Sequence, residues 1–411
     1  MKYYIITHGC QMNISDSERF AGALEYLGFE LSSQLEADLL IINICSVKQS
    51  AVDKALAHKK NDNQKVIITG CYLNKDKERF DADYFMRIDK LKDLDDVLNR
   101  LGFNINKSLD ISHYLDLTPL YGSKISALVP IMTGCNNFCS YCVVPYVRDR
   151  EISRPIEDIL CEIERLIKRG TKEIWLLGQN VNSYKPSFSK LISAIDKIEG
   201  NFWVRFTSSH PKDLSLEMIE TFAKSKKITP YFNLPVQSGD DTILKMMNRP
   251  YTSKKYINLV KQIRKAFKKY KNEDLFLSTD IIVGFPGETK KQFKNTKKLA
   301  KSVKFSMAYI SRYSPRPHTK AFELKDDISN PEKKQRTKQI DKIIRKTALK
   351  FNKKFLNKEV ECLITHKKKD WFIGKTKHYQ TIMIKSNKDL IGQFIKVKIN
   401  KVESFRMFGN I

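Results

Sequence analysis

The sequence predicts an α/β protein with three folded parts: an N-terminal parallel α/β domain, a partial (β/α)6 TIM-like barrel and a small C-terminal antiparallel β-barrel. Up to about residue 322, short β-rich runs alternate with helical stretches, a pattern typical of parallel sheets. Beyond residue 358, β-rich runs follow one another with only turns between them, which favours an antiparallel barrel. We therefore expect domains at residues 1–118, 119–330 and 355–411, with a basic connector helix at 331–354.

The composition is that of a folded soluble protein. Of the 411 residues, 41% are hydrophobic and 29% are charged. The longest apolar run, Leu39–Ile44, is far too short to span a bilayer. The start, MKYYIITHGC, lacks the apolar stretch of a signal peptide. We expect a cytoplasmic protein with no membrane contact.

The formal net charge of +28 is distributed unevenly along the chain. Residues 1–118 carry a net charge of −3, residues 119–330 carry +16, and residues 331–411 carry +15. This asymmetry indicates a polyanionic partner that docks on the C-terminal part. A lysine-rich solvated surface is the alternative.

The N-terminal domain places one cysteine after each of its three predicted strands. Cys10, Cys45 and Cys71 follow these strands, and glycines that precede the first and last of them allow tight backbone turns. Ligand sites in parallel sheets gather beyond the carboxyl ends of strands, so these cysteines should converge in space and hold a cluster. The expected strands are Lys2–Thr7, Leu39–Asn43 and Val66–Thr69, and the expected helices include Asp16–Leu27 and Val47–Lys59.

Three further cysteines lie close together in the segment Val129–Pro155, VPIMTGCNNFCSYCVVPYVRDREISRP. Cys135, Cys139 and Cys142 have a C-x3-C-x2-C spacing, which lets one loop wrap an iron–sulfur cluster. Such clusters usually have four cysteine ligands, so three cysteines leave one iron free to bind a small molecule. A zinc site would normally offer two C-x2-C pairs, and disulfides would require an oxidising compartment.

The middle of the chain predicts six βα-type units whose strands are followed by polar or glycine-rich segments. The active site of a TIM-like barrel lies at the carboxyl ends of its strands. Gly, Ser, Asn and Pro are also ordinary loop residues, but five such segments in register with the strands favour a site. These segments are LLGQNVNSY (Leu176–Tyr184), TSSHP (Thr207–Pro211), PVQSG (Pro235–Gly239), DIIVGFPGE (Asp280–Glu288) and RYSPRP (Arg312–Pro317). The expected strands are Ala127–Met132, Glu173–Leu177, Trp203–Thr207, Tyr231–Pro235, Phe276–Val283 and Met307–Ser311.

The C-terminal part predicts a connector helix and then a barrel of about five strands. Pro331–Lys354 has helical apolar spacing, so its apolar stripe should pack on the central barrel. The barrel combines lysines with aromatic residues, a mixture typical of RNA-binding modules. Cys161 and Cys362 are expected to be simple thiols. The expected strands are Val360–Ile364, Trp371–Lys375, Thr381–Ile384 and Phe394–Ile399.

The cysteine loop resembles the signature of radical S-adenosylmethionine (SAM) enzymes, in which the open iron holds SAM. The segment Thr7–Glu18, THGCQMNISDSE, closely resembles the start of the methylthiotransferase family, in its tRNA-modifying, MiaB-type branch. LLGQNVNSY, LPVQSGDD and MNRPYTS resemble the same branch, and the C-terminal part resembles a TRAM domain. The resemblance covers essentially the whole chain.

The resemblance implies two [4Fe–4S] clusters and SAM as cofactors. Cys135, Cys139 and Cys142 would hold the cluster that binds SAM, whereas Cys10, Cys45 and Cys71 would hold an auxiliary cluster. No catalytic residue is implied beyond these ligands. The expected SAM contacts are Tyr141, Gly178, Gln179, Asn180, Gln237, Ser238 and Gly284. The expected RNA contacts are Arg148, Arg150, Arg154, Lys367, Lys368, Trp371, Lys375 and Lys377.

Two residues in the substrate-side loops depart from the family pattern. Asp149 stands where the Y-x-R-G pattern has glycine, and His318 replaces the glycine of S-P-R-P-G-T. These replacements bear on the contacts with substrate and leave the cluster ligands unaffected. The arginines near Asp149 are expected to bind substrate phosphates, and an ion pair with Glu151 is the alternative.

The implied reaction adds a methylthio group to C2 of N6-isopentenyladenosine at position 37, beside the anticodon of a tRNA. The implied partners are the tRNA anticodon loop, an electron donor such as flavodoxin or ferredoxin, and a sulfur or cluster-repair donor.

Two sister enzymes are alternatives, one acting on N6-threonylcarbamoyladenosine in tRNA and the other on an aspartate of a ribosomal protein. Gln11-Met12-Asn13 counts against the first, because that branch reads G-C-K-V-N. The second branch reads G-C-P-K-N, and a tail suited to a protein substrate should be less basic than this one. A non-catalytic Fe–S protein that binds RNA would leave the five polar barrel segments unexplained.

Overall fold

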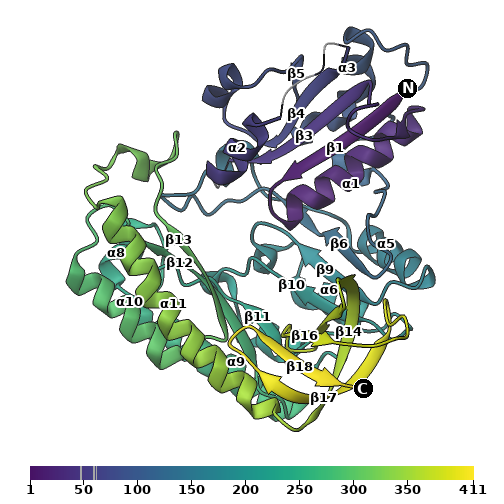
Figure 1. Ribbon diagram of the computed structural model, residues 1–411. Helices are drawn as coiled ribbons and strands as arrows, with labels where there is room; N and C mark the ends of the chain where they lie inside the picture. The colour runs from purple at the N-terminus through teal and green to yellow at the C-terminus, as the bar shows by residue number, and fades with distance from the viewer. Residues whose placement is uncertain (47–48, 59–60, 62) are drawn as a thin grey trace.

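The computed structural model describes residues 1–46, 49–58, 61 and 63–411, and it has the predicted α/β architecture. An N-terminal α/β domain lies above a central half-open barrel, and a small β-barrel packs against the lower side of the central barrel (Figure 1). The predicted helix Val47–Lys59 has both ends outside the described residues, and the described helix within it is α2 (Gln49–Leu56).

The N-terminal domain contains a five-stranded sheet in the order β2-β1-β3-β4-β5, and all its strand pairs are parallel. Its central strand reads LLIINIC and is buried along its whole length, as expected for a strand covered on both faces. The three predicted strands are confirmed and extend slightly further than predicted. The strands are β1 (Lys2–His8), β2 (Glu30–Leu31), β3 (Leu39–Cys45), β4 (Lys65–Cys71) and β5 (Tyr84–Phe85), and the other helices are α1 (Gln11–Tyr26) and α3 (Leu94–Arg100).

The central barrel consists of two parallel three-stranded sheets, in the orders β10-β9-β6 and β11-β12-β13. All six predicted strands are confirmed, with Glu173–Leu177 and Phe276–Val283 correct at both ends. The strands are β6 (Ser126–Pro130), β9 (Glu173–Leu177), β10 (Trp203–Phe206), β11 (Tyr231–Asn233), β12 (Phe276–Val283) and β13 (Met307–Arg312), with a small ribbon formed by β7 (Met132–Thr133) and β8 (Ile152–Ser153). The helices are α4 (Val144–Val147), α5 (Ile156–Lys168), α6 (Phe188–Ile195), α7 (Leu216–Lys224), α8 (Asp241–Met246), α9 (Ser253–Lys271) and α10 (Lys290–Val303).

The C-terminal part is a helix followed by a closed five-stranded barrel in the order β14-β15-β16-β18-β17. The helix α11 (Asn330–Asn352) buries Ile340 and Ile344 in the core of the central barrel, which confirms the predicted packing of the connector. The sequence-based prediction found four of the five strands and missed the last one. The strands are β14 (Glu359–Lys368), β15 (Trp371–Thr376), β16 (Thr381–Ile384), β17 (Phe394–Val402) and β18 (Arg406–Asn410).

A buried arginine and an aromatic contact join the C-terminal barrel to the central barrel. Arg205, on β10, donates to the backbone oxygens of Thr376 and Lys377, each at 2.7 Å. It also forms an ion pair with Glu173 on β9, with 2.6 Å between Nε and Oε1. The Tyr379 ring lies 4.7 Å from that of Tyr231, so a loop of the C-terminal barrel reaches the interior of the central barrel. No helix in the described part of the chain is long and apolar enough to cross a membrane.

Candidate active site

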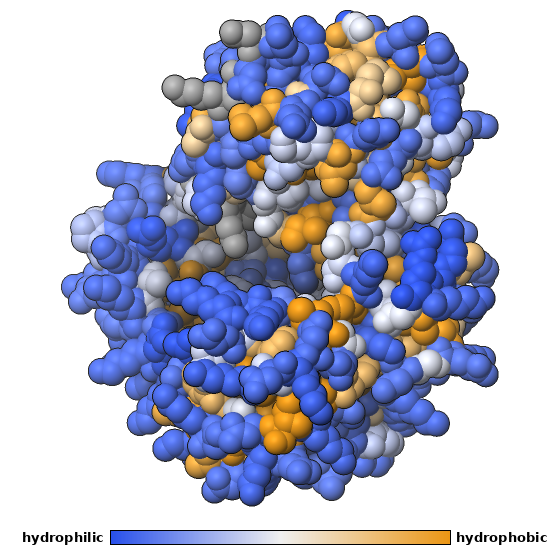
Figure 2. Space-filling model, turned by 45° about the vertical axis from the view of Figure 1, so that its right-hand side comes forward, coloured by the Kyte–Doolittle hydropathy of each residue, from blue (hydrophilic) through white to orange (hydrophobic). Residues whose placement is uncertain are grey.

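The carboxyl ends of the barrel strands and the start of α1 line one open cavity. All three loop cysteines and Cys10 of the N-terminal domain contribute to its lining. Figure 2 shows the molecule hollowed between its upper and lower parts, beneath the N-terminal domain. The loop set therefore meets the N-terminal set at this cavity through Cys10, whereas Cys45 and Cys71 are buried behind it and do not line it.

The cysteine loop is fixed by backbone hydrogen bonds within itself and to the segments at Asp149 and Met247. Cys135 N donates to Asp149 O at 3.1 Å, and Cys142 N donates to Cys139 O at 2.9 Å. Burial raises the pKa of the Cys135 thiol, and burial followed by the charge of Cys139 raises the pKa of Cys142 to about 12. Without a ligand, these thiols therefore favour their protonated form. A bound metal would reverse that preference, because a coordinating thiol is deprotonated.

The three N-terminal cysteines come together as the sequence predicted. Cys45 and Cys71 are directly paired in register on neighbouring strands, and both are buried. Asn13 connects Cys10 to the same sheet, because its Oδ1 accepts from Cys10 N at 3.2 Å and its Nδ2 donates to Asn43 Oδ1 at 2.9 Å. A hydrogen bond with Cys45 and the positive charge of Arg148 lower the pKa of Cys10 to about 6, although burial opposes this shift.

Gly70 shows why a glycine precedes Cys71. It has φ +91°, in the left-handed region that glycine adopts readily. A Cβ at this position would lie 2.2 Å from Asn43 Oδ1 and 2.5 Å from Ile44 O. Gly70 therefore allows β4 to approach β3 closely at the cysteines.

Both cysteine sets fit iron–sulfur clusters by their chemistry. In the described part of the chain, no three His, Cys, Asp or Glu side chains are close enough to hold a single metal ion. A cluster carries each thiolate on a different iron, so it needs wider spacing than a mononuclear site. The buried Arg148 Nη1 has no hydrogen-bond partner in the structure, although it belongs to a guanidinium that contacts Cys71. Such a charged donor suits an anionic group at the N-terminal cysteines.

The predicted SAM contacts fall into two groups. Tyr141, Gly178, Gln179 and Gln237 line the cavity, which keeps them as candidates for SAM binding. Asn180, Ser238 and Gly284 are not part of the lining. Asn180 Nδ2 donates to Asp213 Oδ2 at 2.7 Å, and Ser238 is completely buried beside Thr296. These two side chains support the loops around the cavity.

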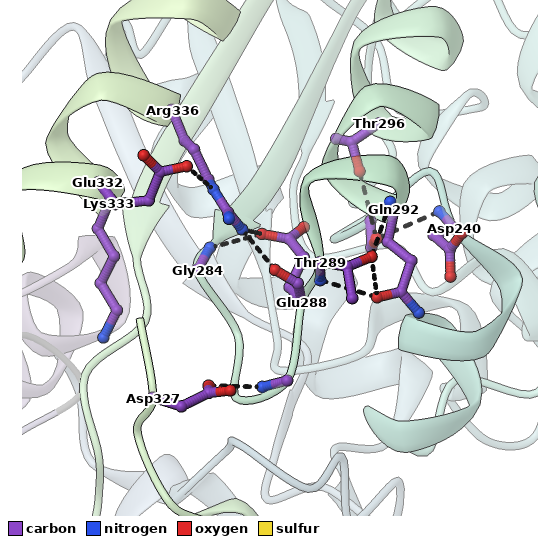
Figure 3. Close-up of polar contacts among 12 residues, drawn as sticks. Asp240, Gly284, Glu288, Thr289, Gln292, Thr296, Asp327, Glu332, Lys333 and Arg336 are labelled. Atoms are coloured by element: carbon purple, nitrogen blue, oxygen red, sulfur yellow. Dashed lines mark hydrogen bonds and ion pairs between the residues drawn. The ribbon is translucent and has the colours of Figure 1, made fainter. Parts of the chain in front are cut away.

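Gly284 belongs to the loop that follows β12, and side chains of α11 contact this loop (Figure 3). Gly284 N donates to Glu288 Oε2 at 2.8 Å, and Arg336 on α11 forms an ion pair with the same carboxylate at 2.7 Å. A Cβ on Gly284 would lie 2.4 Å from the Lys333 side chain, at a φ of +69°. The connector helix thus fixes the loop that follows β12.

Of the three arginines expected at the barrel mouth, the structure places only Arg150 at the surface. Arg150 is exposed, and its guanidinium lies 4.5 Å from the centre of the Phe138 ring. Arg154 is buried in an ion pair with Glu162 at 2.6 Å. Arg148 is buried against Asp16 and Cys71. The positions of Arg148 and Arg154 do not fit contacts with substrate phosphates, because their charges are already used inside the protein.

The two residues that replace family glycines keep a glycine-like backbone. Asp149 has φ +55° and His318 has φ +65°, both in the left-handed region. Non-glycine residues are uncommon there, and such strain concentrates at functional sites. At both positions the chain therefore keeps the left-handed backbone conformation that glycine adopts readily in the family pattern.

Several cavity residues were missing from the sequence-based prediction. Arg249, His210, Asn233, Asp280 and Tyr309 line the cavity. Burial, followed by the charge of Arg249, lowers the pKa of His210 to about 2, so this imidazole is neutral. Three of them had a usable signal in the sequence, since Asn233 ends β11, His210 belongs to the TSSHP segment and Asp280 begins the DIIVGFPGE segment. Arg249 lies between α8 and α9 and had no such signal.

The predicted RNA contacts of the C-terminal barrel divide between two faces. Lys375 lies 4.3 Å over the Tyr379 ring, near Arg205, and burial lowers its pKa to about 8. Lys377 forms an ion pair with Glu361 at 3.1 Å. Lys367 and Lys368 are exposed, and Lys368 and Trp371 line an open groove. The other residues of this groove include Arg345, Lys369, Phe405 and Arg406.

Comparisons with known sequences give matches along the whole chain. Residues 129–300 match the radical SAM superfamily, and residues 2–88 match Uncharacterized protein family UPF0004. A tRNA-2-methylthio-N(6)-dimethylallyladenosine synthase from Carboxydothermus hydrogenoformans is 40% identical, over 99% of this chain and 98% of its own length. Proteins of the same name from Clostridium beijerinckii and Dehalococcoides mccartyi are 37% and 38% identical, over 100% and 98% of this chain and 95% and 97% of their own lengths.

Solved structures share the fold at low sequence identity. The radical S-adenosylmethionine methyltransferase TsrM from Kitasatospora setae superimposes with a TM-score of 0.59 and 12% identity, over 78% of this chain and 75% of that chain. The cobalamin-dependent S-adenosylmethionine radical enzyme OxsB gives a TM-score of 0.54 and 12% identity, over 83% and 56%. These similarities support the arrangement of an N-terminal domain over a half-open barrel.

Proposed function

Because the chain belongs to the radical SAM methylthiotransferase family of the tRNA-2-methylthio-N(6)-dimethylallyladenosine synthases, we propose that it adds a methylthio group to C2 of N6-isopentenyladenosine at position 37 of tRNA. Enzymes of this family use SAM and two [4Fe–4S] clusters. One observation supports the proposal for this chain: Cys10 of the N-terminal set lines the same open cavity as the three loop cysteines. Chemistry that begins at one set can therefore reach a group held at the other.

The cysteines and the other residues of the cavity wall would have different roles in the reaction. When bound, the clusters and SAM supply the radical chemistry and the sulfur that an aromatic C–H bond requires. Cys135, Cys139 and Cys142 would hold the cluster that binds SAM, and Cys10, Cys45 and Cys71 the auxiliary cluster. Tyr141, Gly178, Gln179 and Gln237 would orient SAM, because they line the cavity beside the loop cysteines.

The C-terminal barrel would bind the RNA along the groove around Trp371. This groove combines the cations of Lys368 and Lys369 with the Trp371 and Phe405 rings, whereas its two arginines are paired with Asp341 and Glu403. Cations bind phosphates and aromatic faces stack on unpaired bases, which is the combination that single-stranded RNA requires. Arg150 extends the cationic surface at the central barrel, whereas Lys375 and Lys377 are occupied by contacts within the protein.

We also propose the remaining partners and the location of the reaction. Reductive cleavage of SAM needs an external electron donor, such as flavodoxin or ferredoxin. The sulfur atom transferred in each turnover must be replaced by a sulfur or cluster-repair donor. The substrate is a tRNA, so the protein would act in the cytoplasm.

Mass spectrometry of nucleosides tests the substrate assignment. Reconstituted protein is incubated anaerobically with SAM, dithionite and tRNA that carries either isopentenyl- or threonylcarbamoyl-adenosine. The proposal predicts a methylthio product on the isopentenyl tRNA only. A product only on the threonylcarbamoyl tRNA would assign the protein to the sister branch. SAM cleavage without either product would contradict the tRNA assignment.

A further inference from the structure

Each cysteine set has one buried arginine whose guanidinium donates to a cysteine sulfur. Arg148 Nε lies 3.0 Å from Cys71 Sγ, and Arg249 Nη1 lies 3.7 Å from Cys139 Sγ. Both arginines are almost completely buried. The two thiols concerned belong to different cysteine sets, so each set has a cation of its own.

The cation at the N-terminal set comes from the other domain and has its own counter-ion. Arg148 follows the cysteine loop in the central barrel, yet its side chain reaches the sheet that carries Cys71. Its Nη2 lies 2.5 Å from Asp16 Oδ2 on α1, and Asp16 is completely buried. Asp16 Oδ1 has no hydrogen-bond partner in the structure. The local charge at Cys71 is therefore set by a buried arginine–aspartate pair.

The cation at the loop cysteines has neutral partners. Arg249 Nε donates to the Tyr251 hydroxyl at 2.7 Å, and its Nη2 donates to Pro235 O at 2.7 Å. These bonds fix the orientation of the guanidinium and leave its charge in place. The charge of Arg249 therefore acts on Cys139 without a carboxylate in these contacts.

Charge and hydrogen bonding at the sulfurs are two of the factors that set the reduction potential of an iron–sulfur cluster. Reduction adds one negative charge to the cluster. A buried cation that donates to a ligand sulfur stabilises the reduced state more than the oxidised state, and low surrounding polarity strengthens this effect. Removal of the cation should make the potential more negative, and removal of its counter-ion should make it less negative.

We propose that Arg148 and Arg249 are positioning residues that set the reduction potentials of the two clusters independently, Arg148 together with Asp16 at the N-terminal cysteines and Arg249 at the loop cysteines. The inference rests on the proposed function, because it requires a cluster on each cysteine set. The inference assigns a role to the side chains of Arg148, Asp16 and Arg249, which are not cluster ligands.

Two full-length background proteins separate the clusters for measurement. One carries Ala at Cys135, Cys139 and Cys142, and the other carries Ala at Cys10, Cys45 and Cys71. Each is reconstituted, its iron content is measured, and its cluster is titrated with dithionite, which supplies the one electron taken up per cluster. Electron paramagnetic resonance follows the reduced form and gives the midpoint potential.

The expected shifts cross over between the two backgrounds. Arg148→Gln should make the potential of the N-terminal cluster more negative and leave the loop cluster unchanged. Arg249→Gln should do the reverse. Arg148→Lys keeps the charge and should recover part of the Arg148→Gln shift.

Asp16→Asn separates electrostatics from packing. This substitution keeps the size of the side chain and removes the negative charge, so the N-terminal cluster should shift in the direction opposite to that of Arg148→Gln. A role in packing alone would not produce shifts of opposite sign.

Unchanged potentials in the glutamine variants, with iron content intact, would overturn the inference and leave the proposed function standing. If the Arg148→Gln variant loses its N-terminal cluster, the Asp16→Asn variant provides the test for this cluster instead. An unchanged midpoint potential in Asp16→Asn would overturn the proposed role of Arg148 and Asp16. A wild-type protein that binds no iron on one cysteine set would instead refute the proposed function.

Discussion

Cys139 occupies the centre of the cysteine loop and also contacts the cavity wall. Its carbonyl accepts from Cys142 N at 2.9 Å, and its sulfur lies 3.7 Å from Arg249 Nη1. Cys161 is an exposed cysteine on α5 and does not line the cavity. The two cysteines thus form a matched pair, one inside the site and one outside it.

Cys139→Ala should reduce reductive SAM cleavage at least ~100-fold, because two thiolates cannot hold the cluster that binds SAM. Cys161→Ala should leave cleavage at the wild-type level. Formation of 5′-deoxyadenosine, measured by liquid chromatography under reducing conditions, compares the two variants. Normal cleavage by the Cys139 variant would contradict the role of the loop.

The sequence predicted the six cysteines but not their buried partners, for a physical reason. Three cysteines within one short loop reveal a cluster site by spacing alone. By contrast, Arg148 and Arg249 contact cysteines that are 77 and 110 residues away along the chain. The first contact depends on how the domains pack and the second on how two loops of the central barrel meet, and neither spacing nor periodicity indicates either arrangement. For the same reason, the sequence suggested a surface role for Arg148.

The turn between β15 and β16 packs against the central barrel. His378 and Tyr379 lie in this turn, and Arg205 binds the adjacent backbone. Burial lowers the pKa of His378 to about 4, although Glu273 Oε2 lies 3.3 Å from its Nε2. The docked turn therefore prefers a neutral imidazole.

Acid should weaken this docking through His378. In the unfolded chain the imidazole has a pKa near 6.5 and in the folded chain about 4, so stability present above pH 6.5 is lost as the pH falls towards 4. The loss at pH 5 should be about 2 kcal/mol. Urea unfolding at pH 7 and pH 5 measures it, with His378→Gln as the control. An equal loss of stability in both proteins would contradict this role of His378.

Strands were predicted correctly where the sequence contains a clear β-rich run, and one strand was missed where this run is weak. All six strands of the central barrel have clear β-rich runs, and the structure confirms each of them. β18 reads RMFGN, a short run that ends in Gly409 and Asn410, and both residue types are poor strand formers. Closure of the C-terminal barrel decides its conformation, because it pairs with both β16 and β17.

At the scale of the whole molecule, the groove with lysine and aromatic side chains and the open cavity lie on different domains. The groove around Trp371 belongs to the C-terminal barrel, whereas the cavity lies between the N-terminal domain and the central barrel. A tRNA would therefore contact the protein at two places, with its backbone and unpaired bases at the groove and its target base in the cavity.

The groove should contribute measurably to tRNA affinity. Trp371→Ala should weaken binding by ~1–3 kcal/mol, the usual contribution of a base stacked on an aromatic ring. Lys368→Ala should reduce the slope of log K against log salt by about 1. Lys298→Ala, at an exposed lysine on α10, is the control. If Lys298→Ala and Lys368→Ala changed this slope equally, the groove would contribute no more to tRNA binding than any solvated lysine surface.

The central claim is that two cysteine sets serve one cavity with different roles, and Cys45→Ala tests it most directly. Cys45 is buried in the N-terminal sheet and is no part of the cysteine loop. Both 5′-deoxyadenosine and the methylthio nucleoside are quantified by mass spectrometry in one anaerobic reaction with isopentenyl tRNA. The account predicts that SAM cleavage persists within about threefold of the wild type while the methylthio product disappears. A variant that still forms the methylthio nucleoside at the wild-type rate would contradict it.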